Sequence, residues 1–474
     1  MTDVLTYHND NARTGQTLNE QILTPGKINS NNFGKLWVLA TDGKVMAEPL
    51  YAAGVSIPGK GKRNVVFIMT EHDTVYAFDA DSTNVLWQVS LLGAGEQTVT
   101  SWAWCSFGPE IGISATPVID RQLGPEGTIF VEAMSVDPAG TSFQRLHALD
   151  LATGADRVPP VDITGVYPGL GDNSDGTNVV FDPRMYIERA CLLLLNGVVY
   201  LAWSAHCDTR PATSWIMGFD EHTLAQTSVL NLVPNGNLGS MWNSGAGPAA
   251  DLDGNIYVTL GNGDFDTTFD TNGFPINGNF GCSFVKLSTT GNRLAVADFF
   301  AMYNIMDEIA QDLDLSSGSA LVLPDMTDAQ NNVRQLVVTS GKDEIIYLAD
   351  RANMGKYSSV NNDALYQQVA NALPNGTWSM AAYFNGTLYF GPVRSPIMAF
   401  PFQDARLSTT SSQSPSSFGY PGATPSISAN GTSNGIVWAA ETVGIVIEDQ
   451  TASHNAVLHA FAATNLANEL YHSN

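Results

Sequence analysis

Val75-Tyr76-Ala77-Phe78-Asp79-Ala80-Asp81-Ser82-Thr83 is the stretch that decides the fold, because it joins an alternating apolar strand to an acidic turn. Related segments recur about 50 to 70 residues apart, at 146–154, 216–223, 284–291, 346–351, 397–401 and 458–464. A four-stranded sheet with its loops has this length, so the period is typical of propeller blades. The repeat therefore predicts an all-β, seven-bladed β-propeller of four-stranded antiparallel blades.

The segment Leu146–Gly154 shows the physics of each repeat most clearly. Alternating apolar residues form a half-buried strand, and the Asp-x-x-Thr-Gly sequence after it has the side chains of a tight turn. In the first repeat the turn leads to Trp87, which we expect to pack over the turn of the neighbouring blade. Stacking the blades in a closed ring buries both faces of each sheet and removes the exposed edges.

Small residues precede each predicted second strand and indicate the inner strands at the crowded axis. These stretches are 47–50, 115–118, 246–249, 317–320, 379–382 and 423–426, with a less distinct start near Ala190 in blade three. Either Phe33–Val38 or Glu469–Tyr471 is suited to complete blade seven, so we expect the termini to close the ring. The predicted organisation is an N-terminal arm, 1–35, and one propeller domain, 36–474.

Composition narrows the classes of partner. The chain has 21 basic and 46 acidic side chains, a net charge of −25, which repels phosphate backbones and argues against nucleic acid. No apolar run reaches the length of a membrane span. The polar N-terminus and the Asn-Gly-Thr acceptors at Asn375, Asn385 and Asn430 favour an extracellular protein whose signal peptide is absent from this sequence. We expect a monomer that binds a small molecule or carbohydrate.

The four cysteines, Cys105, Cys191, Cys207 and Cys282, lie far apart in the sequence. They allow three pairings, and the sequence does not choose between them. None has the spacing of a zinc site, so buried thiols or structural disulfides are the expected states.

Two of the repeats resemble a known family. Tyr76–Asp81 with Leu86-Trp87, and Leu146–Gly154, resemble the repeat of pyrroloquinoline-quinone propellers, the quinoprotein alcohol dehydrogenase-like superfamily. The resemblance implies a propeller oxidoreductase. Dehydrogenases of that family usually have eight blades, a vicinal Cys-Cys pair, an Asp-Tyr catalytic segment and a Ca²⁺ site. This chain has neither adjacent cysteines nor an Asp-Tyr pair, so the cofactor stays unknown, with Ca²⁺ a candidate and pyrroloquinoline quinone disfavoured.

The loops that join second to third strands carry the candidate catalytic residues, because such loops gather at one mouth of a propeller. His72 and His206 could exchange protons near neutral pH, and Lys342 and Arg394 could hold a carboxylate or oxyanion. Two carboxylates that could orient them are Glu71 and Asp208. The alternative is that these charged side chains only cap loops.

Aromatic residues near the same mouth predict a cofactor or sugar site. Trp104, Trp242 and Trp378 precede inner strands, and Asn262 lies in an aligned loop, so these four are the candidate cofactor-binding residues. Rings that fill the blade interfaces are the alternative.

The segment Asp264–Gly273 is the candidate metal site. Asp264, Asp266 and Asp270 supply the hard oxygen ligands that Ca²⁺ takes, beside a glycine turn. The spacing is not that of an EF-hand, and a solvated loop is the alternative.

The sequence supports three functional hypotheses. The first is a secreted quinoprotein-like oxidoreductase, and the second is a cofactor-free lyase or hydrolase with a histidine base and a Lys/Arg anion clamp. The third is a non-catalytic ligand-binding propeller, since one fold carries many functions. The chain has no Walker A, GxSxG or HExxH motif, which argues against nucleotide, α/β-hydrolase and zincin chemistry.

Overall fold

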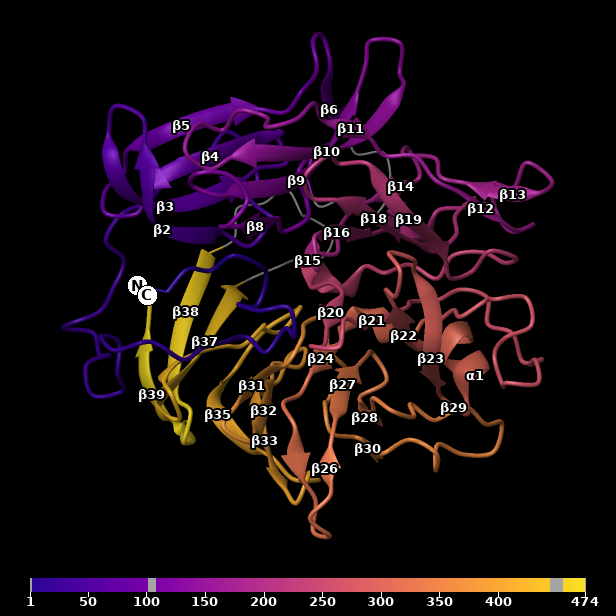
Figure 1. Cartoon of the computed structure of the whole chain (residues 1–474). Coiled ribbons are helices and arrows are strands. Elements are labelled where there is room, and N and C mark those ends of the chain that lie inside the picture. Colours follow the sequence, from indigo (N-terminus) through magenta and orange to yellow (C-terminus); the bar gives the residue numbers. More distant parts are fainter. Residues whose placement is uncertain (1, 101–107, 444–454, 474) are drawn as a thin grey trace.

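The computed structural model describes residues 2–100, 108–443 and 455–473. Within these ranges, seven sheets surround a common axis, as Figure 1 shows. The predicted all-β, seven-bladed propeller is therefore confirmed. No helix in the described ranges has the length and apolar character needed to cross a membrane.

Blade one shows the plan of the ring. Its strands are β2 (Leu50–Ile57), β3 (Gly61–Met69), β4 (Thr74–Asp79) and β5 (Val85–Ser90), all antiparallel neighbours. The repeated segment forms β4, which is buried along its whole length because neighbouring blades cover both faces. The third strand of every blade is one of the repeats found in the sequence.

The other blades have the same order, from an inner strand near the axis to an outer fourth strand. Blade two has β8 (Val118–Asp120), β9 (Thr128–Val136), β10 (Ser142–Asp150) and β11 (Val161–Asp162). Blade three has β15 (Leu193–Leu195), β16 (Val198–Ala202), β18 (Trp215–Asp220) and β19 (Gln226–Asn231). Blade four has β20 (Ala249–Ala250), β21 (Ile256–Thr259), β22 (Phe284–Ser288) and β23 (Ala295–Ala301). Blade five has β24 (Leu321–Val322), β27 (Leu336–Ser340), β28 (Ile346–Asp350) and β30 (Gln367–Val369). Blade six has β31 (Ala382–Phe384), β32 (Thr387–Phe390), β33 (Pro396–Gln403) and β35 (Ser412–Ser417). Blade seven has β36 (Ser426–Asn430), β37 (Ser433–Val443), β38 (Asn455–Ala462) and β39 (Asn465–His472).

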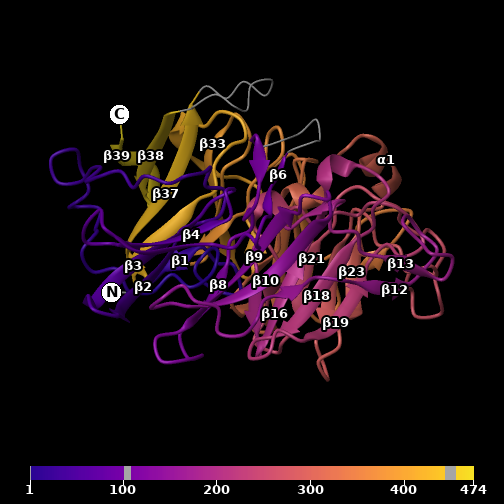
Figure 2. The ribbon, with the colours of Figure 1, turned by 90° about the horizontal axis from the view of Figure 1, so that it is seen from above.

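Short elements decorate this plan. Extra strands join blades two, four, six and seven: β6 (Gln97–Thr100) with β7 (Glu110–Ile111), β29 (Lys356–Tyr357), β34 (Arg406–Leu407) and β1 (Gln16–Thr17). The separate hairpins are β12 (Val166–Pro168) with β13 (Asn178–Val180), β14 (Tyr186–Ile187) with β17 (Ser204–Ala205), and β25 (Met326–Thr327) with β26 (Val333–Arg334). The helices are α1 (Ile305–Ala310), η1 (His206–Asp208), η2 (Asn243–Gly245) and η3 (Leu315–Ser317). In Figure 2, β6 and α1 project from the same face of the disc.

Both ends of the chain contribute to blade seven. The predicted stretch Glu469–Tyr471 lies in β39, the fourth strand, whereas residues 33–38 form no regular strand. Phe33 instead packs against Trp438 and Tyr471, with ring centroids 5.3 and 5.0 Å away. At the inner edge, β1 pairs in parallel with β36.

The axial segment, residues 4–20, runs across the middle of the ring and touches every blade. Val4 pairs with Tyr51 of β2, and the side chain of Asn11 donates to Leu194 O in blade three. The inner strands of the other five blades donate backbone N–H groups to the carbonyls of Leu5, Asn11, Ala12, Thr14 and Gly15. Figure 1 shows this indigo chain reaching the middle of the ring. This part of the predicted N-terminal arm is thus integrated into the propeller.

Arg13 is the buried centre of the axial segment. Its guanidinium donates hydrogen bonds to Pro248 O at 3.0 Å and Leu192 O at 3.1 Å, which belong to the approaches to two inner strands. It also donates to Thr6 Oγ1 and Tyr7 O, within the segment itself. With no exposed surface, the cation is solvated entirely by protein oxygens.

Contacts between blades use the turn residues of the repeat. Trp87 donates its indole N–H to Leu151 O of blade two at 3.0 Å. The side chain therefore lies against the turn of the neighbouring blade, as the sequence predicted. A Cβ atom at Gly154 would lie 2.6 Å from the Trp87 ring, so glycine is required by space as well as by its φ of +73°.

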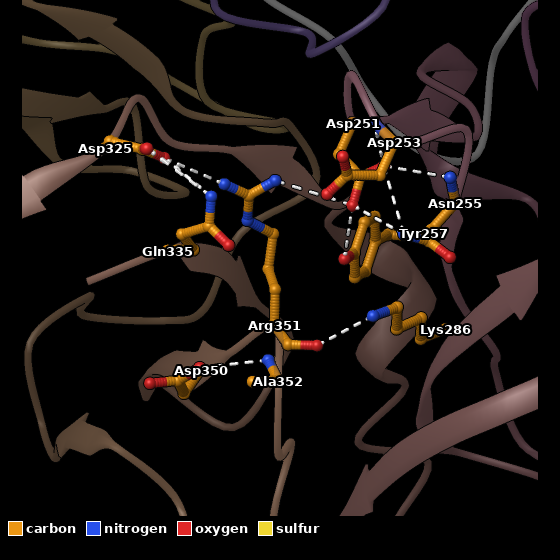
Figure 3. A network of polar contacts seen from close by, with 10 residues as sticks. All are labelled: Asp251, Asp253, Asn255, Tyr257, Lys286, Asp325, Gln335, Asp350, Arg351 and Ala352. Atoms are coloured by element: carbon orange, nitrogen blue, oxygen red, sulfur yellow. Dashed lines mark hydrogen bonds and ion pairs between the residues drawn. The ribbon is translucent and has the colours of Figure 1, made fainter. Parts of the chain in front are cut away.

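A polar network joins blades four and five (Figure 3). Arg351, after β28, pairs with Asp251 at 3.4 Å and with Asp325 at 3.1 Å. Tyr257 donates to Asp251, and Lys286 donates to the backbone carbonyl of Arg351. Charged groups thus hold these two sheets together beneath their apolar contact.

Candidate functional site

Lys342 is the centre of a cluster that the predicted loops bring together. The residue lies after β27, and its ammonium is 2.7 Å from Asp314 Oδ2 and 3.0 Å from Asp312 Oδ2. It also lies 5.8 Å from the ring of Trp242 and 5.7 Å from that of Trp378, which are cation–π distances. Three of the predicted residues, Lys342, Trp242 and Trp378, therefore lie together in one cluster.

A second cation lies against the same ring. The Arg189 guanidinium is 5.9 Å from the Trp242 ring, on the segment between β14 and β15. Burial lowers the pKa of Arg189 to about 10, which the nearby Glu71 and Tyr420 partly oppose, so it is charged at neutral pH. Tyr420 in turn meets Trp378 edge to face, with centroids 6.0 Å apart. We call Arg189, Trp242, Lys342, Trp378 and Tyr420 the tryptophan–cation cluster.

Asp314 and Asn262 support Lys342 from below. Asp314 Oδ1 accepts the Asn262 backbone N–H at 2.6 Å, and the Asn262 amide group donates to Asp312 at 2.6 Å. Burial raises the pKa of Asp314, an effect that the Lys342 ammonium opposes. Asn262 Oδ1 is buried with no hydrogen-bond partner among the described residues, which leaves an acceptor beside the cluster.

A hollow of about 350 Å³ opens next to these residues. Asp208, Asn262, Asp264 and Asp312 are among its lining residues. The Asp208 carboxylate reaches solvent, but the walls limit its hydration, and this desolvation with the charges of Asp314 and Asp312 raises its pKa to about 6. Asp208 can therefore exchange a proton near neutral pH.

Glu71 lies on the Arg189 side of the cluster. Its carboxylate accepts hydrogen bonds from Gly112 N at 2.8 Å and from the Ser114 hydroxyl at 2.9 Å. Burial raises the pKa of Glu71, and these hydrogen bonds with the charges of Lys44 and Arg189 oppose the rise. The residue is an internal acid and does not cap a solvated loop.

The two predicted histidines occupy different environments. His72 has 49% of its side chain exposed, and its Nδ1 lies 2.9 Å from Glu110 Oε2, a hydrogen bond that raises the pKa of His72. His206 is buried in η1, where burial lowers its pKa. We predicted from the sequence that they act as one pair, but their surroundings shift their pKa values in opposite directions: that of His72 rises and that of His206 falls.

Two further candidates do not join the cluster. Arg394 is exposed in the loop after β32, and its side chain has no ion pair within the described ranges. Trp104 lies outside the described residues.

The three carboxylates of the predicted calcium loop serve separate turns. Asp264 accepts from Asn237, Asp266 accepts from Asn277 and Asn279, and Asp270 accepts the N–H groups of its own turn. Across the described ranges, no three His, Cys, Asp or Glu side chains are grouped so that they could hold a metal ion. The structure therefore supplies hydrogen-bonding roles for Asp264, Asp266 and Asp270, and calcium binding there stays a prediction.

The cysteines divide into two kinds. Cys207, in η1 beside Asp208, is disulfide-bonded. Cys191 and Cys282 are buried free thiols, and burial raises the pKa of Cys191 to about 12. Cys105 lies outside the described residues.

Sequence reasoning missed Arg189, Asp314 and Tyr420. They lie four to seven residues before the inner strands of blades three, five and seven, and Trp242 and Trp378 lie within the same range before those of blades four and six. Aligning the segments before the inner strands finds all five. An alignment restricted to the loops between second and third strands misses Arg189, Asp314 and Tyr420.

Comparison with known proteins gives fold-level matches only. No protein-family model matches the sequence, and no curated protein sequence matches it. The quinohemoprotein alcohol dehydrogenase of Comamonas testosteroni matches with a TM-score of 0.59 at 13% identity, over 99% of this chain and 73% of that one. A quinohemoprotein alcohol dehydrogenase of Pseudomonas putida HK5 matches with a TM-score of 0.57 at 12% identity, over 99% and 72% of the two chains.

A europium-containing methanol dehydrogenase matches with a TM-score of 0.52 at 11% identity, over 99% of this chain and 78% of the other. At these identities the similarity establishes the fold. This chain has the propeller fold of the quinoprotein dehydrogenases, as its repeats predicted.

Proposed function

We propose that the tryptophan–cation cluster binds a planar anionic quinone of the pyrroloquinoline-quinone type, and that the protein oxidises a small polar substrate such as an alcohol or sugar. One observation carries this proposal: Lys342 and Arg189 both lie within 6 Å of the Trp242 ring. The fold shared with quinohemoprotein alcohol dehydrogenases supports it.

The residues fit such a molecule by their chemistry. A fused-ring quinone with carboxylates needs a flat apolar surface and cations for its charges, and Trp242 with Lys342 and Arg189 supplies both. The unpartnered Asn262 Oδ1 marks a polar position beside the rings. The vicinal cysteines of the family are absent, so this chain would hold the quinone by rings and charges alone.

The surrounding residues divide the remaining work. A bound quinone supplies a two-electron acceptor. Asp208, with a pKa of about 6, is ionised at neutral pH and can take the hydroxyl proton of a substrate in the adjoining hollow. Asp312 and Asp314 hold Lys342 in place, and Asn262 fixes both carboxylates.

Titration of the purified protein with pyrroloquinoline quinone tests the proposal, with and without Ca²⁺. We expect saturable quenching of tryptophan fluorescence, and then substrate-dependent dye reduction across a panel of alcohols and sugars. Trp242→Ala and Lys342→Met should each weaken quinone binding by about 100-fold, the loss of roughly 2–3 kcal/mol from a desolvated contact.

Matched controls are Trp37→Ala and Lys62→Met, two exposed residues remote from the cluster in the sequence. Both should bind the quinone as the parent protein does. Absence of saturable quenching in the parent protein would overturn the proposal, and so would equal losses in the controls.

A further inference from the structure

Three buried carboxyl side chains have no role in the tryptophan–cation cluster. They are Glu188, Glu132 and Asp73, each at most 2% exposed. Glu188 directly precedes Arg189, Glu132 lies on β9, and Asp73 lies in the turn between β3 and β4. We call these three residues the carboxyl file.

Gly112 connects the file to Glu71. Its N–H donates to Glu71 Oε2 at 2.8 Å, and a Cβ atom at this glycine would lie 2.7 Å from Asp73 Oδ1. The same residue accepts a hydrogen bond from Met134 N at 3.2 Å. Met134 and Glu132 share one face of β9 because side chains alternate along a strand, so Glu132 reaches the same region.

The members of the file influence each other electrostatically in sequence. After burial, the main cause of the raised pKa of Glu188 is the charge of Glu132, and for Glu132 it is the charge of Asp73 and then Glu71. For Asp73, burial is again the largest cause, and the charges of Glu71, Glu110 and Glu96 come next. These charge effects link Glu188 to Glu132, and Glu132 to Asp73, while Gly112 places Asp73 beside Glu71.

Most carboxyl oxygens of the file have no hydrogen-bond partner among the described residues. Both oxygens of Asp73, both of Glu188 and Oε1 of Glu132 are buried and unpartnered. The amide of Ala202 opposes the rise in the pKa of Glu188, but it does not reach hydrogen-bonding geometry. A buried carboxylate without partners is costly, and burial raises the pKa of all three groups, so we expect them to hold protons at neutral pH.

The charged groups that face the file are few. Glu71, Glu96 and Glu110 surround Asp73, and Cys191 and Arg189 lie near the Glu188 end, while Lys44 acts on Glu71. No described cation forms an ion pair with a member of the file, and no described group of acids is arranged to hold a metal ion. Metal binding therefore does not explain why the acids are buried.

An exposed pair lies next to the Asp73 end of the file, because His72 directly precedes Asp73 in the chain and forms a hydrogen bond with Glu110. Their hydrogen bond is 2.9 Å long, and the imidazole is half exposed. With its pKa raised by Glu110, His72 can release and regain a proton near neutral pH.

We propose that Glu188, Glu132 and Asp73 form a proton path between the tryptophan–cation cluster and the His72–Glu110 pair at the surface. The use of this path rests on the proposed function. An alcohol that becomes a carbonyl compound loses two electrons and two protons. The two electrons would pass to a quinone held by the tryptophan–cation cluster and from it to two molecules of an external one-electron acceptor. The two protons would cross the buried region to solvent, along carboxyl groups bridged by water.

Infrared spectroscopy of the full-length protein without quinone tests the path separately from catalysis. Protonated buried carboxyls give a distinct C=O band, which shifts when the proton exchanges with D₂O. We expect this band in the parent protein at pH 7, with loss of one component each in Glu188→Gln, Glu132→Gln and Asp73→Asn. Exchange of the Glu188 component should slow at least tenfold in Glu132→Gln, because its connection outward is cut.

Glu308→Gln is the control, since Glu308 is also buried with an unpartnered Oε2 but lies in α1 of blade four. Its own component should disappear while the exchange of Glu188 stays unchanged. Absence of the band from the file would overturn the proposal, and so would an exchange rate for Glu188 that Glu132→Gln leaves unaltered. Thermal unfolding and circular dichroism identify variants that fail to fold. If Glu132→Gln is one of them, the isosteric Asp73→Asn replaces it in the comparison.

Catalysis provides the second measurement. In Glu132→Gln, dye-coupled turnover and proton release should fall together at least tenfold while quinone binding stays at the parental value. If the parent protein bound no quinone, the proposed function would be wrong, but the infrared result would still test the proton path by itself. Unchanged turnover in an enzyme that binds quinone would exclude the path from catalysis.

Discussion

Lys342 and Asp314 form a largely buried ion pair, with 2.7 Å between Nζ and Oδ2. Lys342 lies at cation–π distance from both tryptophan rings of the cluster, and Asp314 fixes it there. The pair therefore couples the position of a cation to two aromatic rings from different blades. Both charges also act on Asp208: Asp314 raises the pKa of that carboxyl, and Lys342 lowers it.

Replacing Lys342 should shift the pH dependence of catalysis. Lys342→Met removes a charge that lowers the pKa of both Asp208 and Asp314, so both carboxyls should ionise at higher pH. The acid limb of kcat/KM, governed by the Asp208 base, should therefore move to higher pH. Lys342→Arg keeps the charge and should leave the limb in place. An identical limb in parent protein and Lys342→Met would exclude Asp208 as the base.

Removing the buried guanidinium of the axial segment should destabilise the whole ring. Arg13→Met leaves the carbonyls of Pro248, Leu192 and Tyr7 without a buried donor, which should lower the free energy of unfolding by about 3 kcal/mol. Urea denaturation measures this change, with the exposed Lys27→Met as control. A loss no larger than that of the control would show that the segment adds little to stability.

Glu48 should make stability fall as pH rises. Burial raises its pKa from 4.5 to about 7 in the folded protein, so the folded state binds the proton more tightly than the unfolded state. The contribution is complete below pH 4.5 and is lost as pH rises through about 7. The side chain that Glu48→Gln introduces cannot ionise. The stability of this variant relative to the parent protein should therefore be greater at pH 8 than at pH 4. Melting temperatures of both proteins across this range measure the effect, and parallel curves would contradict it.

Gly154→Ala should weaken the contact between blades one and two. The new methyl group would lie 2.6 Å from the Trp87 ring, and the backbone φ of +73° disfavours alanine. We expect a loss of about 2–3 kcal/mol in unfolding free energy. Gly140→Ala offers a control for the backbone cost alone, since its φ is also positive but no atom lies within 4 Å. Combining Gly154→Ala with Trp87→Ala should recover the steric part of the loss.

Alkylation of the unfolded, unreduced protein should distinguish the cysteines. Peptides with Cys191 and Cys282 should be labelled, whereas the peptide with Cys207 should need reduction first. We also infer secretion, because a structural disulfide persists in oxidising compartments. Export to such a compartment should raise the fraction of chains with protected Cys207. Labelling of Cys207 without reduction would contradict both statements.

The strands were predictable because their pattern is local. Val75–Phe78 alternates with period two, and its turn places Trp87 on the next blade, so sequence alone located the repeats and this contact. The site was partly predictable for a similar reason: Lys342 comes after a second strand, and Trp242 precedes an inner one. Alignment of the loops therefore brought them to the same mouth.

The remaining features depend on long-range geometry. Arg394 lies after its strand at the position expected of a site residue, yet its loop directs it to solvent. His72 and His206 occupy equivalent loops, but one is exposed and the other buried. The axial segment has no apolar period, because it is held by backbone hydrogen bonds and Arg13. Its position could not be derived from residue pattern.

The axial segment also has a consequence for the order of assembly. Residues 4–20 leave the ribosome before any blade does, yet Gly15 receives its hydrogen bond from Ile427 of blade seven, which is synthesised after the other six blades. A chain released early, or stalled within blade six, lacks the partner that completes the contacts of this segment. Only a chain that includes blade seven can therefore form every contact that this segment makes at the axis.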